Sequence, residues 1–245
     1  KDFATELFGI AYDDVTKPQR TFCKPPTLGC GYQLGGNGLV AYAADMGVDM
    51  SAADAHRAVK VFRATYPEIK QLWYWLTDSA EAVVNRWEVH QRYGLIMHRD
   101  SDFMYITLPS GRRLVYHQPQ IIDQEIVWFD EQGQRNTMVK PSLTYMGINR
   151  FNLQWERIST HGGGLTENVV QAMSLDILVY QMRVAANRGH WICGTVHDEI
   201  ITVADERYAD EWLQDLLSIM RMSPPWAPDM LLDAAGYTGK HYRKD

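Results

Sequence analysis

Four side chains placed at every fourth position could together hold a nucleotide. Arg20, Lys24, Leu28 and Tyr32 would share one face of a helix, because residues four apart lie one above another on a helix. The two fixed cations could bind the phosphates of a nucleoside triphosphate, and the apolar and aromatic groups could meet its sugar and base. From this spacing alone, a surface helix with two solvated charges is the commoner explanation.

Two prolines lie inside this predicted helix. Pro25 and Pro26 lack amide donors, so we expect the stripe of four side chains to be kinked. Gly29 and Gly31 have no side chains, so a ligand or the backbone of DNA could approach closely at these positions.

Two adjacent carboxylates follow an apolar run near the end of the chain. The runs 191–196 and 200–203 predict two short strands joined at His197, Asp198 and Glu199. The tip of such a hairpin suits Mg²⁺, which prefers one or two carboxylates together with phosphate oxygens and water. Asp and Glu are also common turn residues, so the tripeptide taken alone is a weak indication of a metal site.

A third group of polar side chains lies on a predicted helix that runs to about Asn187. Thr166 is expected to cap this helix, which would place Asn168 and Gln171 one turn apart on one side. Their amides could hydrogen-bond to base edges or sugars. They could equally be exposed polar residues of an ordinary helix.

The elements that must position these residues change in character along the chain. The predicted helices, from apolar spacing and capping residues, are Asp2–Ile10, 51–65, 67–87, 166–187 and 205–220. The predicted hairpins have arms at 103–108 with 114–116, and at 125–129 with residues up to 139 around Gly133. A helical first third, then hairpins, then a helix with a hairpin and a further helix predict an α+β fold with a helical subdomain.

The bulk composition sets loose limits on function. With 46% hydrophobic and 22% charged residues, the chain is an ordinary globular sequence. Its net charge of -6 argues mildly against a nucleic-acid partner, although a protein that holds metal ions with carboxylates can be acidic and still line one groove with cations. Three cysteines without paired spacing, no membrane-length apolar run and no leader-like start predict a cytoplasmic protein without a zinc site or membrane contact.

The order of these three groups is what resembles a known family. A helix with RxxxKxxxLGxGY, then ENxxQA on a helix, then VHDE between two strands resembles the family A DNA polymerases, such as bacterial DNA polymerase I, and especially their phage branch. Other stretches support the resemblance across essentially the whole chain; they are 66–69 with Leu72 and Trp73, 108–112, Trp155 with Thr160, Gly162 and Gly163, and 226–242.

The resemblance implies part of a polymerase right-hand fold, with fingers over 1–100 and a C-terminal palm with the catalytic hairpin over 101–245. The implied reaction is attack of a primer 3′ oxygen on the α-phosphorus of a dNTP, with two Mg²⁺ ions neutralising charge. It makes primer-template DNA and dNTP the partners, and host cytoplasm the location.

The resemblance also implies roles for single residues. Arg20 and Lys24 match phosphate-binding positions, Lys24 counting also as catalytic, while Leu28 faces base and sugar and Tyr32 lies near the templating base. Most bacterial members carry an aromatic residue in place of Leu28, which changes the contact with the sugar. The remaining matches are the metal-binding and catalytic Asp198, the supporting catalytic Glu199, His197 at the primer end, and Gln171, Asn168 and Glu167 at the duplex.

The chain departs from the family before Arg20. There the family has another metal-binding aspartate in an earlier strand, whereas only nineteen residues precede Arg20 and Asp13 and Asp14 read as solvated loop charges. We therefore expect this chain alone not to polymerise, and a complementing polypeptide to supply the missing palm strand and thumb. The alternatives are a non-catalytic DNA-binding or scaffold protein derived from a polymerase, and a metal-dependent hydrolase using His197, Asp198 and Glu199.

Overall fold

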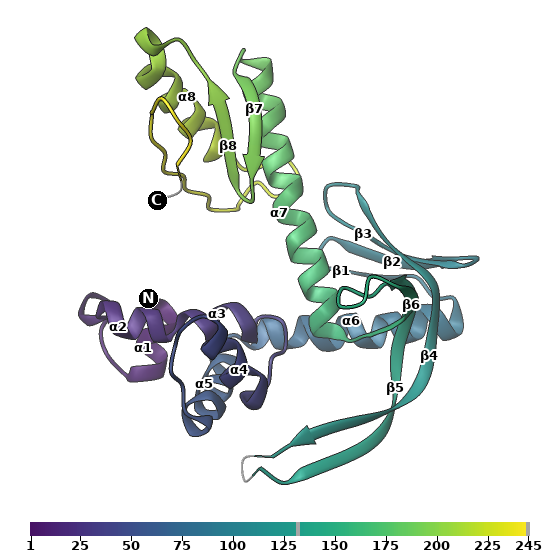
Figure 1. The fold of residues 1–245 in the computed structure, drawn as a ribbon. Helices are drawn as coiled ribbons and strands as arrows, with labels where there is room; N and C mark the ends of the chain where they lie inside the picture. The colour runs from purple at the N-terminus through teal and green to yellow at the C-terminus, as the bar shows by residue number, and fades with distance from the viewer. Residues whose placement is uncertain (131–132, 244–245) are drawn as a thin grey trace. The chain divides into compact units, whose positions relative to one another are not determined.

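The computed structural model describes residues 1–130 and 133–243 (Figure 1). The chain forms two compact units. The first contains Lys1–Thr107 and Arg113–Asn168, and the second contains Leu108–Arg112 and the chain from Val169 onward. Helices and antiparallel strands are mixed in the chain, which confirms the predicted α+β class. The boundary between these two compact units does not fall at residue 100. The functional division into fingers and palm stays a prediction.

The first unit begins with a helical part. Its helices are α1 (Asp2–Phe8), η1 (Tyr12–Asp14), α2 (Lys17–Phe22), α3 (Lys24–Cys30), α4 (Gly36–Asp45), α5 (Ala52–Thr65) and α6 (Pro67–Arg86). Phe3, Leu39, Phe62 and Trp73 are among the buried residues that hold these helices together. Ser51 caps α5, since its Oγ accepts from the amide of Asp54 over 3.1 Å.

A six-stranded antiparallel sheet completes the first unit. Its strands follow in chain order, β1 (His90–Arg92), β2 (Leu95–Asp100), β3 (Phe103–Thr107), β4 (Arg113–Phe129), β5 (Arg135–Ile148) and β6 (Trp155–Thr160). Alternate residues of β2 and β3, among them Met97, Met104 and Ile106, are fully buried on the face where α6 packs. The helix therefore covers one face of the sheet.

Both predicted hairpins are present, but the second is far longer than expected. Figure 1 shows β4 and β5 as one extended ribbon. A bulge between His117 and Gln120, with Gln118 at φ 45°, carries β4 past Pro119, and that polar, proline-containing stretch hides the continuity of the strand in the sequence. The apolar side chains that the ribbon exposes near its end include Val127, Trp128, Phe129, Met138 and Val139.

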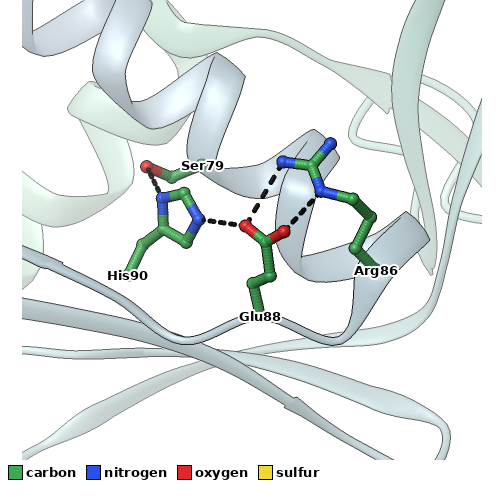
Figure 2. A network of polar contacts seen from close by, with 4 residues as sticks. All are labelled: Ser79, Arg86, Glu88 and His90. Carbon is green, nitrogen blue, oxygen red and sulfur yellow. Dashed lines mark hydrogen bonds and ion pairs between the residues drawn. The ribbon is translucent and has the colours of Figure 1, made fainter.

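A polar network joins the end of α6 to β1 (Figure 2). Arg86 Nε donates to Glu88 Oε1 over 2.5 Å, and His90 lies 2.9 Å from Glu88 through Nε2 and 3.0 Å from Ser79 through Nδ1. The hydrogen bond from Arg86, and next that from His90, lowers the pKa of Glu88 to about 2. Ser79 is buried inside α6. The network therefore fixes the passage from helix to sheet.

The second unit is built on the long helix α7 (Gly162–Asn187), whose first residues belong to the first unit. It also contains β7 (Trp191–Val196), β8 (Glu199–Val203), η2 (Glu206–Tyr208) and α8 (Ala209–Met220). Its core includes Leu178, Ile200, Leu216 and Ile219. None of the helices in the described residues combines the length and apolarity needed to span a bilayer.

The three cysteines have different surroundings. Cys23 and Cys30 are buried in the helical part, where burial raises the pKa of Cys23 to about 11 and that of Cys30 to about 12. Cys193 on β7 is exposed. All three thiols are free.

Candidate nucleotide-binding surface and carboxylate turn

The predicted cationic helix is two helices. Thr16 and Gln19 form a capping box at the start of α2, and the chain passes from α2 to α3 at Cys23. Pro25 and Pro26 lie in the first turn of α3, where the missing amides have no intrahelical acceptor to lose. Cys23 keeps right-handed helical angles at the junction. The two prolines therefore begin a new helix there with little change of backbone conformation.

The outer side of these two helices carries three of the four predicted side chains. Arg20, Lys24 and Leu28 are exposed, whereas Cys23 and Cys30 on the opposite side are buried. Neither cation has a hydrogen-bond or ion-pair partner for its side chain within residues 1–130 and 133–243. Two unpaired cations one turn apart are available to an anionic ligand.

Tyr32 departs from the expected stripe. It lies beyond the end of α3, in the turn 31–33, and is half-buried. The prediction of one helical face for all four residues is therefore wrong at Tyr32, because the helix ends at Cys30. Burial raises the pKa of Tyr32, and the nearby charge of Glu167 acts in the same direction.

The turn that holds Tyr32 packs between α6 and the start of α7. Trp73 Nε1 donates to the carbonyl of Gly31 over 2.7 Å. The amide of Gly163 donates to Gln33 Oε1 over 3.0 Å, and His161 Nδ1 lies 3.2 Å from the same oxygen. Burial, and next the charge of Lys140, lowers the pKa of His161 although Glu167 opposes the shift. These contacts fix Tyr32 relative to the first turn of α7.

The predicted DNA-binding residues of α7 have different surroundings. The expectation that Thr166 caps this helix is wrong, because α7 begins at Gly162 and the buried Thr166 hydroxyl donates to the Gly162 carbonyl over 2.8 Å. Asn168 Nδ2 contacts the hydroxyl of the buried Tyr116 over 3.1 Å. Glu167 is half-buried and Gln171 is exposed. Binding of DNA by these three residues stays a prediction.

The carboxylates lie where the sequence predicts them, at the end of a hairpin. Val196 pairs with Glu199, which leaves His197 and Asp198 as a two-residue turn. His197 supplies the positive φ, 53°, that such turns require at a central residue. All three residues of the motif are exposed. The hairpin thus presents its acidic end to solvent.

The two carboxylates differ in their partners. The hydroxyl of Tyr242 donates to Glu199 Oε2 over 2.8 Å, so the chain near its C-terminal end orients Glu199. Asp198 has no hydrogen-bond or ion-pair partner in the part of the chain that the structure describes. Its oxygens are therefore free to bind a cation.

These oxygens fit a part of a Mg²⁺ site. Mg²⁺ prefers carboxylate oxygens combined with water and substrate phosphate, and Asp198 with Glu199 offers that chemistry. Across the described residues, no three His, Cys, Asp or Glu side chains gather in a way that could hold a metal ion. Asp198 and Glu199 therefore supply only part of the donor set that a Mg²⁺ ion needs.

The structure places the predicted residues in two groups. Arg20, Lys24, Leu28 and Tyr32 belong to the first unit with Glu167 and Asn168, and Gln171, His197, Asp198 and Glu199 belong to the second. Two contacts of the turn 31–33 are not predicted from the sequence, that of Gln33 with Gly163 and that of Gly31 with Trp73. The glycine run Gly162–Gly164 is the feature of the sequence that could have indicated close packing around this turn, because glycines have no side chain to keep two backbones apart.

No protein-family model matches the chain. The chain is 31% identical over 245 residues to a DNA polymerase of Bacillus phage SP02, and the match covers 99% of this chain and 36% of that protein. The chain is therefore related over nearly its whole length to a phage DNA polymerase, of which it spans about a third.

Proposed function

We propose that these residues form the fingers and the C-terminal palm of a family A, DNA polymerase I-like enzyme of the phage branch. The observation that carries the proposal is the exposed face of Arg20, Lys24 and Leu28, whose two cations have no partner among the described side chains. The relation to a phage DNA polymerase, 31% identical over 245 residues, supports the same assignment. The ligand of this face would be a dNTP.

The proposed reaction is nucleotidyl transfer. The primer 3′ oxygen forms a bond with the α-phosphorus of the dNTP, and the bond to pyrophosphate breaks. Arg20 and Lys24 bind the triphosphate and neutralise charge that moves toward the leaving pyrophosphate. Leu28 lies against base and sugar, and Tyr32 lies near the templating base.

The carboxylate turn would supply the metal-binding half of the palm. Asp198 would hold Mg²⁺, which when bound lowers the barrier by neutralising charge on the reacting phosphate. Glu199, oriented by Tyr242, supports that turn, and His197 lies at the primer end. Glu167, Asn168 and Gln171 would contact the primer-template duplex.

The proposed site needs groups from outside residues 1–245. Two metal ions require a second carboxylate on another strand, and the duplex requires a thumb. We propose that polypeptide beyond these residues supplies both, as a complementing chain or as further sequence of the same protein. The enzyme would act in the cytoplasm of the host.

Primer extension tests the proposal. The chain is assayed with Mg²⁺ and dNTPs, alone and mixed with the N-terminal part of a matching phage polymerase. We expect extension in the mixture, its loss in Asp198→Ala, and a raised KM for dNTP in Lys24→Ala. Asp229→Ala and Lys60→Ala are matched controls, because both side chains are exposed and neither has a partner within the described ranges.

The outcomes separate the proposal from its alternative. Extension that persists in Asp198→Ala would contradict a catalytic role for the carboxylate turn. DNA binding without extension in any mixture would favour a non-catalytic DNA-binding protein.

A further inference from the structure

The end of the nucleotide-binding surface is attached to the first turn of α7 through one side chain. The first amides of a helix have no acceptor within the helix, so they need partners from elsewhere. Gln33 supplies such a partner, because its Oε1 accepts from the amide of Gly163 over 3.0 Å. Gln33 is 130 residues away in sequence. It therefore acts as a long-range cap of α7.

The backbone of Gln33 is held in an uncommon conformation. Its φ is 69°, in the left-handed region that non-glycine residues rarely occupy. The Gln33 amide donates to the Cys30 carbonyl over 3.1 Å, which closes the end of α3. The left-handed turn directs the side chain toward Gly163 and His161. Backbone outliers of this kind persist where surrounding contacts maintain them.

Two glycines make this close packing possible. A Cβ on Gly163 would lie 2.2 Å from the Tyr32 carbonyl oxygen and 2.6 Å from Gln33 Cβ. A Cβ on Gly162 would lie 2.0 Å from the Trp73 carbonyl oxygen. Trp73 in turn binds the Gly31 carbonyl. The turn 31–33 is thus enclosed by α6 on one side and by α7 on the other.

The contact joins two sets of side chains that the proposed reaction needs in register. The nucleotide-binding face leads into Tyr32, and the first turns of α7 carry Glu167 and Asn168, all within the first unit. We infer that Gln33 is a positioning residue for nucleotide addition, holding the nucleotide-binding surface in register with the DNA-contacting start of α7. This inference rests on the proposed function.

The role predicts a specific kinetic defect. Without the Gln33 side chain, the turn loses its hydrogen bond from the Gly163 amide, which keeps His161 Nδ1 as an acceptor. Arg20 and Lys24 would still bind the triphosphate. Misplacement of a reacting group by about 1 Å can lower a rate by roughly 100-fold. We expect Gln33→Ala to lower kcat for the correct dNTP by about 10- to 100-fold, with a change in KM of no more than about threefold.

Two further variants separate the side chain from the backbone. Gln33→Gly removes the same side chain but relieves the left-handed strain, so we expect the same loss of kcat as in Gln33→Ala. Gln118→Ala is the matched control, since Gln118 is an exposed glutamine with φ 45° in the same unit. It should leave both kcat and KM unchanged.

The experiment is steady-state primer extension over a range of dNTP concentrations, with this chain mixed with the N-terminal part of a matching phage polymerase as above, together with melting temperatures of each variant. Equal kcat in wild type and in Gln33→Ala would overturn the positioning role, as would recovery of kcat in Gln33→Gly. A wild-type protein that neither extends a primer nor binds dNTP would instead refute the proposed function. The two failures are therefore distinguishable.

Discussion

Asp215 pairs with the imidazole of His190, whose Nε2 lies 2.9 Å from Asp215 Oδ2. The His190 side chain is fully buried and packs edge-on against Trp212, and its Nδ1 has no partner in the described chain. Arg188 donates to the other oxygen of the same carboxylate over 2.6 Å. One carboxylate thus joins the end of α7, the start of β7 and α8.

We expect Asp215→Ala to lower the free energy of unfolding by about 1–3 kcal/mol, because it leaves a second buried nitrogen of His190 without a partner. The urea midpoint of the chain measures this loss. Asp233→Ala is the control, since the exposed Asp233 pairs with Arg221 at the surface and such pairs contribute about 0–1 kcal/mol. Equal losses in both variants would contradict a special role for the buried imidazole.

The same carboxylate predicts how stability depends on pH. The hydrogen bond from His190 is the largest cause that lowers the pKa of Asp215, with the one from Arg188 adding to it against burial. A carboxylate with a lowered folded pKa stabilises the fold above its unfolded pKa and loses that contribution as the pH falls through the folded value. We expect the urea concentration at the unfolding midpoint to decrease as the pH is lowered past about 4. In Asp215→Asn this decrease should be less steep.

The loop between β3 and β4 depends on a second carboxylate. Ser110 Oγ and Arg112 Nε donate to Asp176 over 2.5 and 2.6 Å, and the Asp176 side chain is only 11% exposed. We expect Asp176→Asn to cost about 1–3 kcal/mol, because the charge that holds Arg112 is lost. Trypsin cleavage after Arg112 should then become faster. Ser174→Ala on the same helix should leave the cleavage rate unchanged.

A methyl group tests the packing around Tyr32. Gly163→Ala places a Cβ 2.2 Å from the Tyr32 carbonyl oxygen, so backbone must move. We expect a loss of stability of about 1–3 kcal/mol or more, as for overpacked cores, measured as a lower melting temperature. Gly35→Ala meets nothing within 4 Å and has an ordinary backbone. A melting temperature equal to that of Gly35→Ala would contradict the tight contact.

The polar network of Figure 2 predicts a lowered pKa for the Glu88 carboxyl, which can be measured. The carboxyl of Glu88 should titrate at about 2, chiefly because Arg86 and then His90 donate to it. In Arg86→Ala the pKa should rise toward the ordinary value of about 4.3. Carbon-13 NMR of the side-chain carboxyl follows both titrations. An unchanged pKa in the variant would assign the shift to another group.

The sequence predicts the elements that bury one continuous apolar stripe. Residues of α6 such as Trp73, Leu76 and Val83 recur at helical spacing and are all buried, so this helix is predicted nearly to its ends. In α4 the pattern fails, because it begins in the run 35–38, which reads as a loop. There Gly36 packs against the ring of His56, a contact between distant residues that no local pattern contains.

The site shows the same limit. Asp198, Arg20 and Lys24 are predicted because their residue types and spacing reflect chemistry, and all three are exposed without partners in the described chain. The contact of Gln33 with Gly163 is not predicted, since only the fold brings the two residues together. The strands β1 and β2 are missed because neither shows alternating apolar spacing; β1 has no apolar residue, and in β2 the apolar run 95–97 is followed by polar residues.

The burial of two cysteines makes the third one useful as a probe. A maleimide dye reacts with thiolates that solvent can reach, so Cys23 and Cys30, with raised pKa values, should remain unmodified in the folded chain. Cys193 stands exposed on the strand that leads into the carboxylate turn. A single dye on the native Cys193 could therefore test whether a cation or a nucleotide binds near Asp198, without any engineered cysteine.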